Sequence, residues 1–143
     1  MLQKCLGYAE KDKNFIDGDY SICVDEKHME NVRERYGFTN LITTLRKSIS
    51  ASDNGWSGAV CSESGLYQGS GYNLHIVDRV GGGDSFAAGF LHGILTHMEP
   101  DRALEFALAA AAIKHTIPGD LNYISEEEVL TLMNSDGSGR VNR

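Results

Sequence analysis

The sequence predicts an α/β domain built in layers, with part of its sheet antiparallel. Three observations indicate this class. Residues 41–77 hold apolar, strand-forming runs separated by turn signals, three successive glycines follow at 81–83, and residues 84–133 show helical apolar spacing. Strands followed by a run of helices are typical of a sheet that helices cover.

The first elements can be placed by their caps and turns. Asp25 can cap a helix that ends at Gly37. Residues 41–45, Leu-Ile-Thr-Thr-Leu, predict a buried strand. Residues 53–55, Asp-Asn-Gly, predict a hairpin turn, and residues 58–61 predict the returning strand.

Two further strands precede the glycines, and a helix follows them. A turn is expected at 63–65, with strands over 66–69 and 72–77. A helix is expected from Asp84 to about Thr96. Its predicted core stripe consists of Ala87, Phe90, Leu91, Ile94 and Met98.

The C-terminal part predicts two more helices. Pro100 suits the first turn of a helix to about Lys114, which is poor in bulky side chains because of its alanine run. Ser125 and Glu128 form a capping box for the last helix. Residues 134–143 are polar and predict a disordered tail.

Composition restricts the class of protein. A length of 143 residues suits one domain, and no apolar run approaches the roughly 18 residues of a membrane span. The net charge of −7 argues against nucleic acid or an anionic membrane as the main partner. Three scattered cysteines and no signal peptide predict reduced thiols and a cytoplasmic location.

The glycines at 81–83 stand where a strand-like run gives way to a helix. Backbone N–H groups in such a corner, together with the positive end of the helix dipole, favour a bound anion and above all phosphate. Asp84 at its lip would repel phosphate, so it needs a role there. Taking a proton from a hydroxyl that attacks the phosphate is such a role.

Two common glycine motifs do not describe this corner. A P-loop requires a lysine directly after its last glycine, and none follows here. The dinucleotide fingerprint requires a small residue where this sequence has Phe86.

What remains, D-x-x-G-G-G-D-S-F over 78–86, resembles the signature of ribokinase-like, pfkB-type sugar kinases. Segments 44–48, 51–57 and 114–120 are most similar to the 2-keto-3-deoxygluconate kinase branch. The resemblance covers residues 1–133 as the C-terminal, nucleotide-binding half of such a kinase. It implies a ribokinase-like three-layer fold whose mixed sheet has antiparallel hairpin strands.

The resemblance implies roles for the corner. Asp84 would be the catalytic base, and the N–H groups of Gly81, Gly82, Gly83 and Asp84 would stabilise the transferring phosphoryl group. Asp78 would help bind a monovalent cation, K⁺ in some relatives. Arg79 and Val80 depart from the commonest form of this part of the motif.

The resemblance also implies a site for ATP with Mg²⁺. Thr44 and Arg46 would lie beside the nucleotide phosphates. The alanine-rich helix would line the adenine pocket, and the residues expected to contact the nucleotide there are Ala107, Leu108, Ala111 and Lys114.

Structural interpretations stand beside these roles. Asp84 could be only a helix N-cap, and the alanine run could serve close helix packing. The histidines show no metal-ligand spacing, so surface or packed positions are expected for all five. Arg46 and Lys47 could be solvated charges at a strand end.

Two functions are therefore expected. The first is ATP-dependent transfer of phosphate to a hydroxyl of a small sugar acid such as 2-keto-3-deoxygluconate. The alternative is a truncated, catalytically incomplete fragment that binds nucleotide or packs on a partner. Since the sugar site and lid of the family belong to the N-terminal half, self-association or a complementary N-terminal chain is expected.

Overall fold

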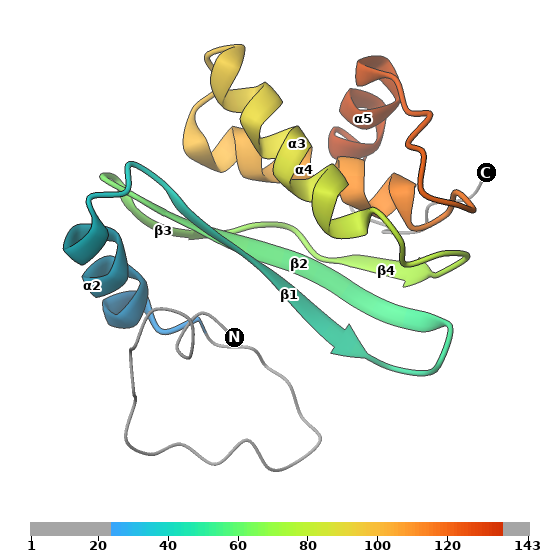
Figure 1. Ribbon diagram of the computed structural model, residues 1–143, viewed down its shortest axis with the longest axis horizontal. Coiled ribbons are helices and arrows are strands. Elements are labelled where there is room, and N and C mark those ends of the chain that lie inside the picture. Colours follow the sequence, from blue (N-terminus) through green and yellow to red (C-terminus); the bar gives the residue numbers. More distant parts are fainter. Residues whose placement is uncertain (1–23, 136–143) are drawn as a thin grey trace.

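The computed structural model describes residues 24–135, so the predictions for residues 1–23 and 136–143 lie outside the described part (Figure 1). The elements in chain order are α2 (Glu26–Tyr36), β1 (Leu41–Ser48), β2 (Asp53–Ser62), β3 (Gly65–Gln68), β4 (Tyr72–His75), α3 (Gly82–Leu95), α4 (Pro100–Lys114) and α5 (Glu126–Met133). None of these helices combines the length and apolar character needed to cross a bilayer.

Helix α2 begins and ends where its caps predict. The Asp25 side chain accepts a hydrogen bond from the backbone N–H of His28 at 3.2 Å. Gly37 closes the helix in the left-handed region with φ +66°, and its N–H donates to Glu34 O at 3.2 Å. Both predicted caps are confirmed.

Strand β2 is the centre of the sheet and pairs antiparallel with each of the other described strands. Its pairing with β1 runs from Leu41 opposite Cys61 to Ser48 opposite Asn54. Its two ends pair with β3 and β4. The expected antiparallel hairpin strands are therefore confirmed, and β1 has a strand on one side only within residues 24–135.

The first hairpin turn lies earlier than predicted. Ser50 closes it, because its hydroxyl donates to Asp53 Oδ2 at 2.7 Å and accepts from the N–H of Asp53 at 2.9 Å. Asp53 and Asn54 belong to β2, and Asn54 is 1% exposed. The Asp-Asn-Gly turn prediction was wrong because the Ser50 side chain supplies the turn's hydrogen bonds and the buried Asn54 accepts one from Arg46.

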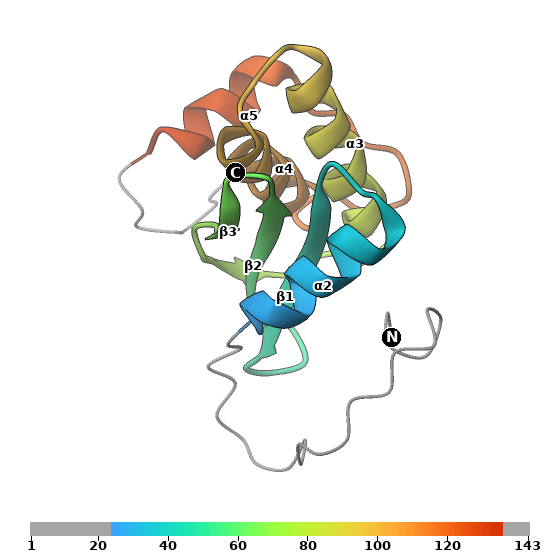
Figure 2. The same ribbon diagram turned by 90° about the vertical axis from the view of Figure 1, so that its left-hand side faces the viewer.

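Helices cover both faces of the sheet, which gives three layers (Figure 2). On one face α3, α4 and α5 pack with Trp56, Val60 and Leu74 in the larger core cluster. On the other face α2 packs against Leu41 and Cys61. The three-layer α/β class predicted from the sequence is confirmed.

Helices α3 and α4 approach each other closely because glycines face alanines. A Cβ on Gly93 would lie 2.7 Å from Ala103 Cβ, and a Cβ on Gly89 would lie 2.9 Å from Ala107 Cα. Phe90 of the predicted stripe is buried, but Ala87 is exposed and Leu91 is 61% exposed. Gly89 and Gly93 take the place of Ala87 and Leu91 at the interface with α4, so the predicted core stripe is only partly correct.

Helix α5 starts at the predicted capping box. Ser125 accepts from the N–H of Glu128 at 3.2 Å, and the Glu128 carboxylate accepts from the N–H of Ser125 at 2.9 Å. Val129 then packs into the larger core cluster.

Candidate active site

The corner after β4 leaves backbone donors free. Gly81 is the N-cap of α3 with φ +76°, and the helix starts at Gly82. Ser85 N donates to Gly81 O at 2.8 Å, and Gly82 N donates weakly to Arg79 O at 3.5 Å. Within residues 24–135, the N–H groups of Gly83 and Asp84 donate to no other group. Two free amides at a helix start make a site for an anion.

Asp84 is an exposed residue in the first turn of α3. The cap is Gly81, and the cap makes no side-chain hydrogen bond. The interpretation of Asp84 as only an N-cap is therefore wrong. Its carboxylate has no hydrogen bond or ion pair with another residue of the described chain, so it is free to meet a ligand.

His115 supports the corner from beneath. A Cβ on Gly82 would lie 2.6 Å from His115 Cε1, so only glycine lets the ring come so close. His115 Nδ1 donates to Ala111 O at 2.6 Å, and its ring centroid lies 4.8 Å from that of Trp56. His115 O accepts from the N–H of Val77 at 2.9 Å. His115 is packed, which is one of the two kinds of position expected for the histidines.

Burial of the imidazole lowers the pKa of His115, and the charges of Lys114, Arg46 and Arg79 act in the same direction. The unfolded chain then takes up a proton below about pH 6.5 while the folded chain resists it. We expect the contribution of His115 to the free energy of unfolding to be fully present above that pH. It should decrease as the pH falls below that value. The slope is at most about 1.4 kcal/mol per pH unit, the limit for one proton.

Urea unfolding of the wild type and of His115→Gln between pH 5 and 8 measures this effect. Because glutamine does not titrate, the variant loses this component of the slope. Equal slopes in both proteins would contradict the assignment to His115.

Asp78 ties the corner to the loop after α4. Its Oδ1 accepts from Val80 N at 3.0 Å, and its Oδ2 accepts from Gly119 N at 2.8 Å. These backbone hydrogen bonds, helped by the Lys114 charge, hold the pKa of Asp78 below its usual value. Asp78 is therefore a carboxylate that fixes two backbone segments.

Thr44 and Arg46 lie on the sheet face that carries the corner. Residues directly opposite in an antiparallel pair share a face, and Thr44 lies opposite Gly58 while Arg46 lies opposite Trp56. Trp56 contacts the His115 ring. Arg46 Nε donates to Asn54 Oδ1 at 3.1 Å, which holds the exposed guanidinium on this face.

The residues expected to line an adenine pocket are inside the protein. Their side chains are 0% exposed: Ala107, Leu108, Ala111 and Lys114. Gly69 covers Leu108 so closely that a Cβ there would lie 2.5 Å from Leu108 Cδ1. These side chains pack inside the described structure, and their contact with a nucleotide stays a prediction.

Sequence reasoning missed two residues beside the corner. Trp56 packs on Phe86 with ring centroids 6.3 Å apart and on His115. Arg79 was noted only as a departure from the motif, yet its guanidinium donates to Ala51 O at 2.7 Å and its charge reaches His115. The sequence did hold a signal for Arg79: it is a cation placed directly after Asp78 in a chain of net negative charge, which could have indicated a role at the corner.

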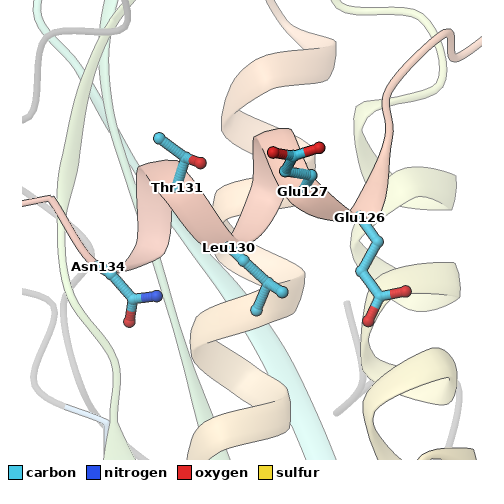
Figure 3. A pocket seen from close by; sticks show the side chains of 5 residues that line it. All are labelled: Glu126, Glu127, Leu130, Thr131 and Asn134. Carbon is cyan, nitrogen blue, oxygen red and sulfur yellow. The ribbon is translucent and has the colours of Figure 1, made fainter.

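Two surface hollows lie on the helical layer. The one in Figure 3 is formed on α5 by Glu126, Glu127, Leu130, Thr131 and Asn134, and its two carboxylates make it unsuited to phosphate. The other, of about 280 Å³, extends from Ser85 and Asn122 to Phe106 and Val129. At one end of this hollow, Asn122 Nδ2 donates to Ser85 Oγ at 2.7 Å. Ser85 directly follows Asp84 in the sequence, so the hollow lies next to the candidate catalytic base.

A family model described as pfkB family carbohydrate kinase matches residues 52–126. Among curated proteins, the 2-dehydro-3-deoxygalactonokinase of Haloferax volcanii is 30% identical over 86 residues, which are 59% of this chain and 27% of that protein. An ATP-dependent ribose-1-phosphate kinase of Halopiger xanaduensis is 42% identical over 66 residues, 46% of this chain and 22% of that protein.

Solved structures agree with these sequence relatives. The crystal structure of the 2-dehydro-3-deoxygluconokinase of Thermotoga maritima aligns with a TM-score of 0.79 and 39% identity. The alignment covers 92% of this chain and 38% of that one. The chain thus spans well under half the length of the relatives that it matches.

Proposed function

The chain belongs to the pfkB family of carbohydrate kinases, and on that premise we propose that its glycine corner binds the terminal phosphates of ATP during transfer to a hydroxyl of a small sugar acid. The names of two relatives, a 2-dehydro-3-deoxygluconokinase and a 2-dehydro-3-deoxygalactonokinase, support this acceptor class. The name of a third, an ATP-dependent kinase, supports ATP as the donor.

The free N–H groups of Gly83 and Asp84 bind the transferring phosphoryl group as negative charge redistributes on its oxygens. Preorganised donors of this kind contribute about 2.7–4 kcal/mol each in comparable oxyanion sites. The αL conformation of Gly81 and the contact of Gly82 with His115 hold the two amides in place. Little reorganisation is then needed during the reaction.

Asp84 accepts the proton of the acceptor hydroxyl. Its carboxylate is exposed and has no partner within the described chain, so a substrate hydroxyl can reach it. The hydroxyl oxygen attacks phosphorus, the bond to the β–γ bridging oxygen breaks, and ADP leaves. Catalysis rests on positioning and electrostatics, as in other phosphoryl transfers.

Local cations offset the overall negative charge of the chain. Arg46 and Arg79 both act electrostatically on His115 beneath the corner. We assign Arg46 and Thr44 to the side of the nucleotide phosphates, because both lie on the sheet face that carries the corner. A guanidinium matches phosphate in charge and geometry.

Mg²⁺ is expected to arrive with the nucleotide. Within residues 24–135 no three metal-ligating side chains gather. Mg²⁺ commonly uses substrate phosphates with only one or two carboxylates, so this donor set suits an ion held chiefly by ATP. No step assigned here to a side chain depends on it.

The single observation that carries the proposal is a carboxylate and two backbone amides at one helix start that have no partner within residues 24–135. Calorimetric titration with ATP, followed by ADP release with 2-keto-3-deoxygluconate, tests it. We expect binding of ATP but not of adenosine, and ADP release that requires the sugar acid. Equal binding of adenosine would overturn the phosphate assignment.

The cytoplasmic location, and pairing of the β1 edge with a second chain or an N-terminal half, stay predictions.

A further inference from the structure

Lys114 carries a charge into the interior behind the glycine corner. It is the last residue of α4 and its side chain is 0% exposed. Its ammonium donates to Gly119 O at 2.8 Å and to Ile117 O at 3.3 Å. A buried ammonium is stable only where such acceptors surround it, so the loop after α4 is shaped around this charge.

The same ammonium group lies close to the corner itself. A Cβ on Gly81 would lie 3.1 Å from Lys114 Cε, so the lysine stem packs against the N-cap of α3. Asp120 directly follows Gly119, and its backbone oxygen would also lie 3.1 Å from a Cβ on Gly81. Gly119 binds Lys114 through its carbonyl and Asp78 through its N–H. Lys114, Asp78 and the loop therefore form one charged cluster behind Gly81.

The resemblance to potassium-activated kinases implies a monovalent cation at Asp78, and the residues present do not fit one. Such an ion needs backbone carbonyl and carboxylate oxygens. The carbonyls of Ile117 and Gly119 already accept from an ammonium. Both Asp78 oxygens accept backbone N–H groups. A second cation in this cluster would also be repelled by Lys114.

We propose that the Lys114 ammonium is a built-in substitute for the monovalent cation, and that it makes the phosphate site independent of potassium. Lys114 is a positioning residue: it fixes the loop after α4 and Asp78, and through them the backbone at Gly81. The effect on phosphate binding rests on the proposed function. The effect on stability does not.

The test measures ADP affinity and the thermal unfolding midpoint in KCl, NaCl and tetramethylammonium chloride at equal ionic strength. Wild type should give the same values in all three salts. Lys114→Met keeps the length of the stem without its charge, and should lose about tenfold or more in ADP affinity in every salt. Lys114→Ala opens the space and should regain part of that affinity in KCl alone. Lys47→Met, at an exposed lysine on β1, should match wild type.

A wild-type midpoint or ADP affinity that rises only in KCl would overturn the proposal, even if neither variant folds. Wild-type affinity in Lys114→Met would also overturn it. Should the wild type bind no ADP in any salt, the proposed function fails and the midpoints decide. If the thermal unfolding midpoint of the wild type is the same in KCl as in the other salts, the proposal is supported. If that midpoint is higher in KCl alone, the proposal is refuted.

Discussion

We expect Asp84→Asn to slow phosphoryl transfer severely, while the chain folds normally and binds ATP more tightly than wild type. The amide cannot accept the hydroxyl proton, so the rate should fall by about 10²–10⁴-fold. Tighter ATP binding follows because a negative charge disappears from the lip of a phosphate site. The loss of that charge from the first turn of α3 costs only about 0.3–1 kcal/mol in stability. Rates of ADP release and calorimetric titration with ATP measure the two effects.

The matched control is Asp101→Asn, which removes an acidic group from the first turn of α4. It should leave both the rate and the ATP affinity unchanged. If the isolated chain shows no turnover, the ATP affinity still decides, because only the variant at the corner should bind more tightly. An Asp84→Asn protein that keeps its rate, or that binds ATP more weakly, would contradict the role of this carboxylate.

Gly82→Ala should destabilise the fold and weaken ADP binding together. The new methyl group would lie 2.6 Å from His115 Cε1 and 2.7 Å from His115 Nε2. The ring cannot move aside easily, because Ala111 O and Trp56 hold it. Overpacking of this kind costs about 1–3 kcal/mol. The strain falls on the turn that presents the free amides, so affinity for phosphate should fall too. Urea unfolding and titration with ADP measure the two losses.

Gly83→Ala is the control for stability. A Cβ at Gly83 has no heavy atom within 4 Å, and alanine is a better helix former than glycine. This variant should be at least as stable as wild type. Equal stability of Gly82→Ala and wild type would show that His115 does not hold the corner.

Local signals in the sequence were enough for the ends of helices. Asp25, Gly37 and the Ser125–Glu128 pair each satisfy backbone groups within a few residues, so their effect depends little on the rest of the fold. The glycine corner was found for the same reason. Its donors are consecutive amides, and their direction follows from the helix that begins there.

Contacts between distant segments could not be predicted in this way. Asp-Asn-Gly reads as a turn locally, but Asn54 is paired in β2 and bound by Arg46. The alanine run fits either a flat ligand or a close helix, and only the facing Gly89 and Gly93 decide for the helix. The cluster of Lys114 with Asp78 joins residues 36 positions apart through Gly119, and no local pattern reports such a contact.

The proposed function of this chain depends on phosphate binding to the free amides of Gly83 and Asp84. The most direct measurement is the two-dimensional NMR spectrum of the ¹⁵N-labelled chain, titrated with ADP and with adenosine. We expect the amide resonances of Gly83 and Asp84 to shift with ADP and with inorganic tripolyphosphate, and to stay in place with adenosine. Unchanged resonances for these two amides while ADP binds, with shifts confined to other elements, would contradict the account.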